Sequence, residues 1–134
     1  MMDIFRVWDV QRKVLANVTS ILWLSEDEVE IDHDKNGFRE PFQIHPDTAV
    51  LERFIRVSDK HKKQIFEGDI IKHNETLFVV EFSETQLGFI CIDRKHRTRG
   101  RFPNWRDGQW IRNVSNHIEV VGNIHELPDG WEEA

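Results

Sequence analysis

The sequence has a single cysteine, Cys91, among its 134 residues. One cysteine cannot form an intramolecular disulfide, which favours a reducing compartment over a secreted setting. A chain of this length with a hydrophobic fraction of 39% can bury enough surface to fold without crosslinks. We therefore expect a single self-sufficient domain that spans residues 1–134.

Long apolar runs are also missing from the sequence. No stretch approaches the roughly 20 apolar residues that a membrane-spanning helix needs. The N-terminus, MMDIFRVWDV, does not have the basic and then apolar order of a signal peptide. We expect a cytoplasmic protein that does not associate with a membrane.

Familiar catalytic and metal-binding patterns are absent as well. None of the seven histidines has HxH or HExxH spacing, and no serine lies in a GxSxG elbow. Cys91 lies in the apolar run FICI, so we expect a buried structural thiol. The sequence predicts no enzyme activity, no catalytic residues, no metal and no cofactor.

One segment partly matches a calcium-binding loop. Residues 32–43 fit the first half of the EF-hand pattern, but Gln43 stands where a bidentate glutamate is needed. The residues before this segment also read as a strand, not as a helix. We interpret it as a polar hairpin turn, with a weak Ca²⁺ site as the alternative.

Alternation of apolar and polar residues, typical of β-strands, dominates the chain. Strand-like runs occur at residues 4–8, 28–32, 76–82, 88–93 and 117–124. Turn-forming residues separate these runs. Many short antiparallel strands predict a mainly-β fold, with a small SH3-like antiparallel barrel. We expect an N-terminal β segment (1–45) packed on a part that contains the barrel and a C-terminal tail (46–134).

The segment 46–57 fits two patterns. Val50, Leu51 and Phe54 have the spacing of one face of a helix, whereas alternation along the same segment favours a strand. We expect a short helical turn near 47–52, followed by a strand.

Glu67, Gly68 and Asp69 form a group with two possible roles. On an extended backbone the Cβ atoms of the two carboxylate residues would lie about 6–7 Å apart, and such a pair can act as acid and nucleophile. The interpretation that we favour is a structural turn. In it, Gly68 adopts a special backbone geometry and Asp69 accepts hydrogen bonds from backbone N–H groups.

Positive charge is concentrated in residues 94–112, whose net charge of +6 contrasts with −6 for the whole chain. The candidate binding residues of this basic segment are Arg94, Lys95, Arg97, Arg99, Arg101, Trp105, Arg106, Trp110 and Arg112. Cations bind phosphates and aromatic rings stack on unpaired bases, so the mixture suits single-stranded nucleic acid.

Two other interpretations of the basic segment stay open. Its cations could balance the acidic remainder of the chain, either within one molecule or across the interface of a homo-oligomer. Alternatively, Phe102, Trp105 and Trp110 could close one end of the barrel and leave the arginines in solvent.

Three blocks of sequence resemble the YopX family of bacteriophage and prophage proteins. The blocks are Ile4–Asp9, Asp59 with Ile65–Ile71, and Ile118–Ile124 with Glu126 and Pro128. They correspond to the family patterns FRxWD, TGLxDxxGxxIYEGD and EVIGNIYENP, and together they span nearly the whole chain. The resemblance implies a mainly-β fold, a phage or prophage origin and a host-cytoplasmic setting. It implies no mechanism, because the family has no established activity.

The central block departs from the family pattern at several positions. Ile55-Arg56-Val57 replaces Thr-Gly-Leu, Lys62 replaces the glycine before IYEGD, and Phe66 replaces its tyrosine. If the central turn of the family depends on those glycines, this chain must build the turn differently.

We therefore expect an uncharacterised phage or prophage accessory protein that acts as a non-enzymatic binding or regulatory module. Its partner would be an unknown protein, with homo-oligomer formation a further possibility. The alternative is a single-stranded nucleic-acid-binding protein that uses the basic segment, residues 94–112.

Overall fold

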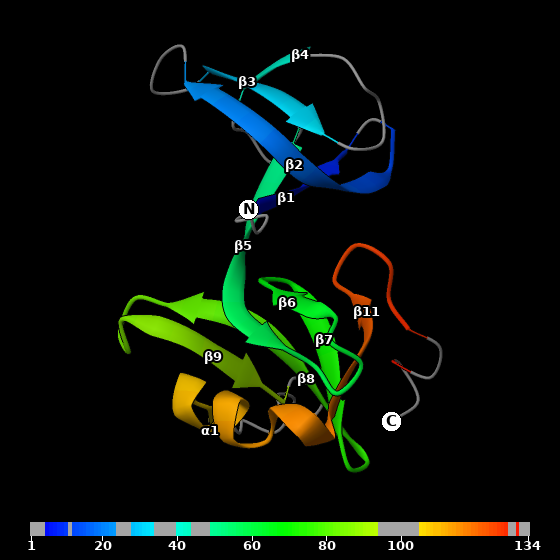
Figure 1. Cartoon of the computed structure of the whole chain (residues 1–134), viewed down its shortest axis with the longest axis vertical. Coiled ribbons are helices and arrows are strands. Elements are labelled where there is room, and N and C mark those ends of the chain that lie inside the picture. Colours follow the sequence, from blue (N-terminus) through cyan, green and yellow to red (C-terminus); the bar gives the residue numbers. More distant parts are fainter. Residues whose placement is uncertain are drawn as a thin grey trace, which may run out of the picture. The chain divides into compact units, whose positions relative to one another are not determined.

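The computed structural model describes residues 5–10, 12–23, 28–33, 40–43, 49–93, 105–128 and 131. The strands are β1 (Phe5–Asp9), β2 (Val14–Trp23), β3 (Glu28–His33), β4 (Glu40–Gln43), β5 (Ala49–Ser58), β6 (Gln64–Phe66), β7 (Asp69–His73), β8 (Thr76–Ser83), β9 (Gly88–Ile92), β10 (Trp105–Arg106) and β11 (Ile118–Asn123). The helical segments α1 (Gly108–Asn113) and η2 (Ser115–His117) lie between β10 and β11 in the chain (Figure 1). The mainly-β prediction is confirmed.

The strands form two antiparallel sheets. One has the order β4-β3-β2-β1-β5-β6, and the other has the order β10-β9-β8-β7-β11. One of the two sheets curls into a half-barrel. Neighbouring strands are mostly consecutive in the chain, as short hairpin connections require. The more specific assignment to a small SH3-like antiparallel barrel stays a prediction.

The chain divides into two compact units, residues 1–54 and 55–134. The boundary falls within β5, so this strand contributes its first half to one unit and its second half to the other. Each unit has its own cluster of buried apolar side chains. The expected division into an N-terminal segment (1–45) and a barrel with its tail (46–134) stays a prediction.

The first unit is built around β1, which pairs with β2 on one side and β5 on the other. Val7 is fully buried on β1, whereas the neighbouring Arg6 is buried beside Glu52 of β5. These two charged residues are direct cross-strand partners, and Arg6 Nε donates a hydrogen bond of 2.8 Å to Glu52 Oε1. A buried charge is tolerated when it is paired in this way.

The second unit contains the larger core. Its fully buried members include Ile65, Ile71, Val80 and Ile118. Phe78, Val79 and Val80 are consecutive on β8 and all buried, so this strand is covered on both faces.

The prediction of a helical turn near 47–52 is wrong for the residues that the structure describes there. Residues 49–52 already belong to β5, where Leu51 pairs with Val7 and Val50 pairs with Trp8. Strand pairing with β1 overrides the helical spacing of the apolar residues, as tertiary context often does. Residues 44–48 lie outside the described part of the chain.

Arg56 and Lys62, the two positions where the family pattern has glycine, have positive φ angles. Their values are 70° and 66°, in the left-handed region that favours glycine. At these two positions the chain holds an arginine and a lysine in a backbone conformation typical of glycine.

Candidate binding site beside helix α1

The short helix α1 begins at Gly108, directly after Asp107. Asp107 caps the helix, because its side-chain oxygen Oδ1 accepts a hydrogen bond of 3.0 Å from the Trp110 N–H. Aspartate at this position satisfies one of the free N–H groups at the start of a helix. The basic segment therefore ends in a helix, which the sequence did not predict.

Helix α1 packs on the core of the second unit through Ile111 and Trp110. Ile111 is almost fully buried. The Trp110 ring lies 5.3 Å from the ring of Phe78 and 5.1 Å from that of His73, between ring centroids. These contacts hold the half-buried Trp110 ring against the core of the second unit.

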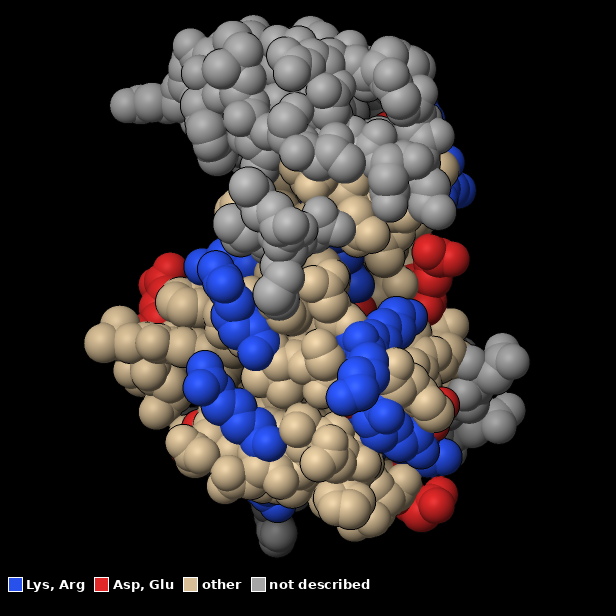
Figure 2. All heavy atoms as spheres, in the orientation of Figure 1, with Lys and Arg blue, Asp and Glu red and all other residues tan. Residues whose placement is uncertain are grey.

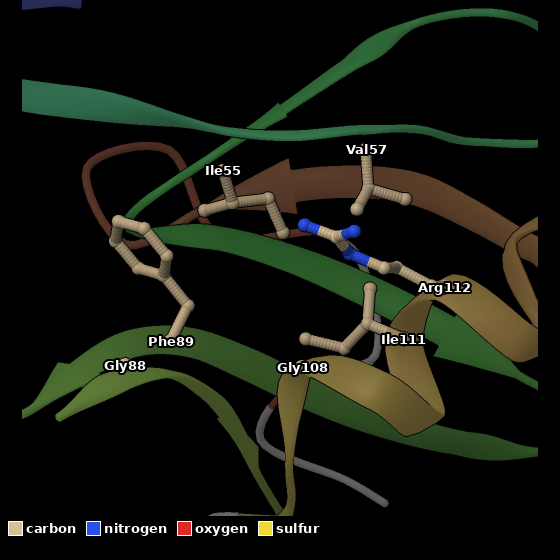
Figure 3. Close-up of a pocket in the computed structure, with 7 residues that line it drawn as sticks. All are labelled: Ile55, Val57, Gly88, Phe89, Gly108, Ile111 and Arg112. Atoms are coloured by element: carbon tan, nitrogen blue, oxygen red, sulfur yellow. The ribbon is translucent and has the colours of Figure 1, made fainter. Parts of the chain in front are cut away.

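An open cleft of about 220 Å³ lies between α1, β9 and the second half of β5. Its lining residues are Ile55, Val57, Gly88, Phe89, Gly108, Ile111 and Arg112. Figure 3 shows the Phe89 ring at one end of the cleft and the Arg112 guanidinium directed into the space between Val57 and Ile111. The cleft is an apolar site with one cation in it.

Arg112 is the one charged residue in this lining. Among the described residues it has no ion pair and no side-chain hydrogen bond. Arg106 differs, because its Nη1 donates to the Trp105 carbonyl at 3.2 Å and its guanidinium lies 6.0 Å from the Trp110 ring centroid. Arg112 therefore offers a guanidinium that can bind an anion.

Further cations lie on the surface of the second unit. Figure 2 shows Lys and Arg side chains spread over the tan surface of that unit, with Asp and Glu toward its margins. The exposed cations among its described residues are Arg56, Lys60, Lys62, Lys63, Arg106 and Arg112. These cations can contact an anionic group of a partner.

The predicted binding residues are described only in part. Arg94, Lys95, Arg97, Arg99 and Arg101 lie outside the described residues. Trp105 on β10 is 41% exposed and Arg106 beside it is also exposed, whereas Trp110 is half-buried.

Several residues that line the cleft were not predicted from the sequence. Ile55, Val57 and Phe89 looked like ordinary strand residues, and their apolar character matches that of the core. No local signal in the sequence shows that β5 and β9 approach α1 closely enough to form a cleft. Only the fold brings these residues together.

The Glu67-Gly68-Asp69 group forms a tight turn between β6 and β7. Gly68 has a φ of 83°, and its backbone joins the turn to Val80 and Ile124 by hydrogen bonds of 2.8 Å. Asp69 is 1% exposed, and its Oδ2 accepts a hydrogen bond of 2.8 Å from the Phe66 N–H. A carboxylate so enclosed is engaged in holding the turn.

Asp59 has a similar role in the loop between β5 and β6. Its Oδ1 accepts from the His61 and Lys63 N–H groups at 2.8 and 2.9 Å, and its Oδ2 accepts from the Val120 N–H at 3.0 Å. Burial alone would raise the pKa of Asp59. The hydrogen bonds from Val120, Lys63 and His61, with the charge of His61, outweigh burial and lower that pKa.

The third block of the family resemblance also forms a turn. A Cβ atom on Gly122 would lie 2.8 Å from Cδ of Pro128, so a larger residue would force the chain to shift where it folds back. Asn123 Oδ1 accepts hydrogen bonds of 2.9 Å from the N–H groups of both His125 and Glu126. The described residues of all three blocks thus include buried or turn-forming positions with clear structural roles.

Other candidate sites offer less. Cys91 is fully buried, and burial raises the pKa of its thiol to about 12. No cluster of three or more His, Cys, Asp or Glu that could hold a metal occurs among the described residues. The EF-hand-like segment, residues 32–43, contains the end of β3 and all of β4, which pair with each other, and its residues 34–39 are not among those that the structure describes. No helix in the described ranges is long and apolar enough to cross a membrane.

Comparisons with known proteins identify a family and a fold. The model of the family described as YopX protein matches residues 4–130. Protein EF1440 from Enterococcus faecalis has a similar crystal structure, with a TM-score of 0.59 and 21% sequence identity over 96% of this chain and 97% of that one. At this identity the likeness shows the fold alone. No curated protein matches the chain.

Proposed function

The chain belongs to the YopX family, and on this premise we propose that it is a non-enzymatic binding or regulatory module whose partner is an anionic protein. The observation that carries the proposal is the Arg112 guanidinium, which lies without an ion pair among the described residues in an otherwise apolar cleft. In this proposal the module is a phage or prophage accessory protein that acts in the cytoplasm of the bacterial host.

A binding role suits the chemistry of the second unit better than a catalytic one. Of the carboxylate pair considered for catalysis, Asp69 is enclosed and accepts a backbone hydrogen bond. Asp59 is likewise held by three backbone N–H groups. Such carboxylates stabilise turns, and proton transfer would break the bonds that hold them.

Electrostatic attraction supports an anionic partner. The basic segment 94–112 has a net charge of +6 in a chain whose total is −6, so the remainder has a charge of −12. A partner that approaches the basic side is attracted, and one that approaches the acidic side is repelled. This polarity predicts association that weakens as salt screens the charges.

The proposal can be tested by affinity capture from induced or infected host lysate, with and without nuclease. We expect the tagged protein to retain one specific protein after nuclease treatment, and to lose it as salt rises from about 50 to 500 mM. Reversing Arg97, Arg99 and Arg101 to Glu should abolish capture. Retention of the same partner by this variant at low salt would contradict the electrostatic basis of the proposal.

Single-stranded nucleic acid is the second candidate partner. The exposed Trp105 precedes the exposed Arg106 on β10 within the basic segment, and a base-stacking site uses such a combination of an aromatic ring and a cation. If this candidate is correct, oligo(dT) quenches Trp105 fluorescence at low salt, and nuclease treatment of the host lysate removes the captured partner. A Trp105→Leu variant with unchanged oligo(dT) binding would rule it out.

A further inference from the structure

We infer that the cleft beside α1 binds an acidic polypeptide segment, with an apolar side chain in the cleft and a neighbouring carboxylate on Arg112. This inference rests on the proposed function, because it names the chemical class of the partner and the part of the partner that is recognised. It is drawn from the size of the cleft, its lining, its cation and its two glycines.

The size of the cleft suits a side chain better than a whole cofactor. Its volume of about 220 Å³ is below the range of roughly 300–1,000 Å³ for small-molecule sites. The cleft is also partly open to solvent, so a chain segment can lie across the opening and direct one side chain inward. This is how grooves on proteins commonly recognise peptides.

The lining favours an apolar side chain over a nucleotide base. Ile55, Val57 and Ile111 are aliphatic, and Phe89 supplies the one aromatic ring. Base recognition needs aromatic faces for stacking and polar groups for the base edge. In this lining the one polar side chain is Arg112, which cannot accept a hydrogen bond. An aliphatic or aromatic side chain needs none of these groups.

The cation specifies the polar part of the ligand. A guanidinium binds a carboxylate through two parallel N–H···O bonds, and the exposed Arg112 side chain is accessible to a ligand. Arg112 has no such partner among the described residues. A carboxylate next to the apolar side chain of a ligand would satisfy it.

Gly88 and Gly108 leave space in the cleft, although the backbone conformation requires glycine at neither position. Neither Gly88 nor Gly108 has a positive φ angle. A Cβ atom on Gly88 would lie 4.0 Å from the Gln86 carbonyl oxygen, and one on Gly108 would lie 3.7 Å from that of Phe89, both ordinary contacts. Gly108 is also the first residue of α1, where alanine would favour the helix. The missing side chains leave room for a ligand.

The test is an NMR titration of the full-length ¹⁵N-labelled protein. N-acetylphenylalanine supplies an apolar side chain with a carboxylate, and its carboxamide is the neutral matched probe. We expect the acid to shift the amide signals of Gly88 and Gly108 and the Nε–H signal of Arg112. The carboxamide should bind about tenfold more weakly, the factor lost with a charge-assisted hydrogen bond.

Two pairs of variants test whether the probes bind in the cleft. Arg112→Gln should weaken binding of the acid about tenfold and leave the carboxamide unchanged, whereas Arg106→Gln, which removes a charge outside the cleft, should change neither. Gly88→Ala and Gly108→Ala should reduce binding of both probes with no loss of melting temperature, because each adds a methyl group to the space that a ligand would fill.

Several results would overturn the inference. They are equal binding of acid and carboxamide, no binding of the acid at 10 mM, shifts outside the cleft, and shifts in the cleft with the dinucleotide pTpT in place of the acid. Failure here is distinguishable from failure of the proposed function. If the captured protein partner binds Arg112→Gln normally, only the cleft assignment fails; if no partner is captured but the acid binds, only the proposed function fails.

Discussion

Single polar side chains hold the turns of this protein at the scale of the residue. Asp59, Asp69, Asp107 and Asn123 each accept hydrogen bonds from backbone N–H groups of residues close in sequence. Side chains of this length reach the adjacent backbone, which explains their frequency at turns and helix starts. Three of the four lie in the blocks that resemble the YopX family, so those blocks describe how the chain folds more than what it binds.

Replacing Asp59 by Asn should lower stability in a pH-dependent way. Asn keeps one oxygen acceptor for the three N–H groups, so we expect a loss of about 1–3 kcal/mol at pH 7. The pKa of Asp59 is lowered in the folded protein. The stability that this shift contributes is therefore present above the unfolded value of 3.8 and lost as pH falls below it through the folded pKa.

Urea unfolding at pH 7, 5, 4 and 3 measures this effect. The difference between wild type and Asp59→Asn should be constant from pH 7 to 5 and shrink below pH 4. Glu84→Gln, which changes an exposed carboxylate in the turn after β8, serves as control. A difference that stays constant down to pH 3 would show that the charge of Asp59 is not involved.

Arg56→Gly and Lys62→Gly should each stabilise the protein. A non-glycine residue in the left-handed region costs about 1–2 kcal/mol, and this outweighs the roughly 0.5–1 kcal/mol by which glycine destabilises a chain through entropy. A net gain of up to about 1 kcal/mol is expected from the denaturation midpoint. Lys63→Gly is the matched control for Lys62→Gly, because Lys63 lies in the same loop without a positive φ. If Arg56→Gly and Lys62→Gly lower the stability as Lys63→Gly does, Arg56 and Lys62 do not have the left-handed backbone conformation.

At the scale of the element, the period-two patterns predicted β3, β8, β9 and β11 close to their observed bounds. These patterns were readable because apolar alternation is a local property of the sequence. The first half of β5 was misjudged since its conformation depends on pairing with β1, about 45 residues away in the chain. Helix α1 was missed because six residues give too short a periodic signal.

The candidate site was predictable only where it depends on composition. Positive charge directed attention to the basic segment and thus to Arg112. The cleft itself depends on β5 and β9, which are distant in sequence from α1 and whose residues resemble any core strand. A local reading of the sequence could not bring Val57, Phe89 and Arg112 together.

Gly122→Ala should destabilise the end of β11 strongly. The new methyl carbon would lie 2.8 Å from Pro128 Cδ and 3.2 Å from the Glu126 carbonyl oxygen, so backbone must shift to admit it. We expect a loss of about 1–3 kcal/mol, measured by thermal and urea unfolding. Gly88→Ala is the control, since its methyl group meets nothing closer than 4.0 Å. Equal stability of the two variants would contradict the close approach of Pro128.

At the scale of the whole molecule, two compact units share one chain but have separate apolar cores. The first unit contains the buried Arg6–Glu52 pair, and the second contains Cys91, the sole cysteine of the sequence. A substitution can therefore be made in the first unit while reaction of the Cys91 thiol measures opening of the second unit. This arrangement allows a direct test of whether the units unfold independently.

Arg6→Ala should destabilise the first unit by about 3–5 kcal/mol, because it removes the Arg6 guanidinium from the buried Glu52 carboxylate. The loss should appear as faster hydrogen exchange of the Val7 amide.

Reaction of Cys91 with a thiol reagent requires the second unit to open, since the thiol is buried and its pKa is raised to about 12. If the units unfold independently, Arg6→Ala leaves the Cys91 labelling rate within twofold of wild type. Ile118→Ala, which opens a cavity in the core around Cys91, should accelerate labelling at least tenfold and leave exchange at Val7 unchanged. Equal acceleration of labelling by both variants would show instead that the two cores unfold as one cooperative unit.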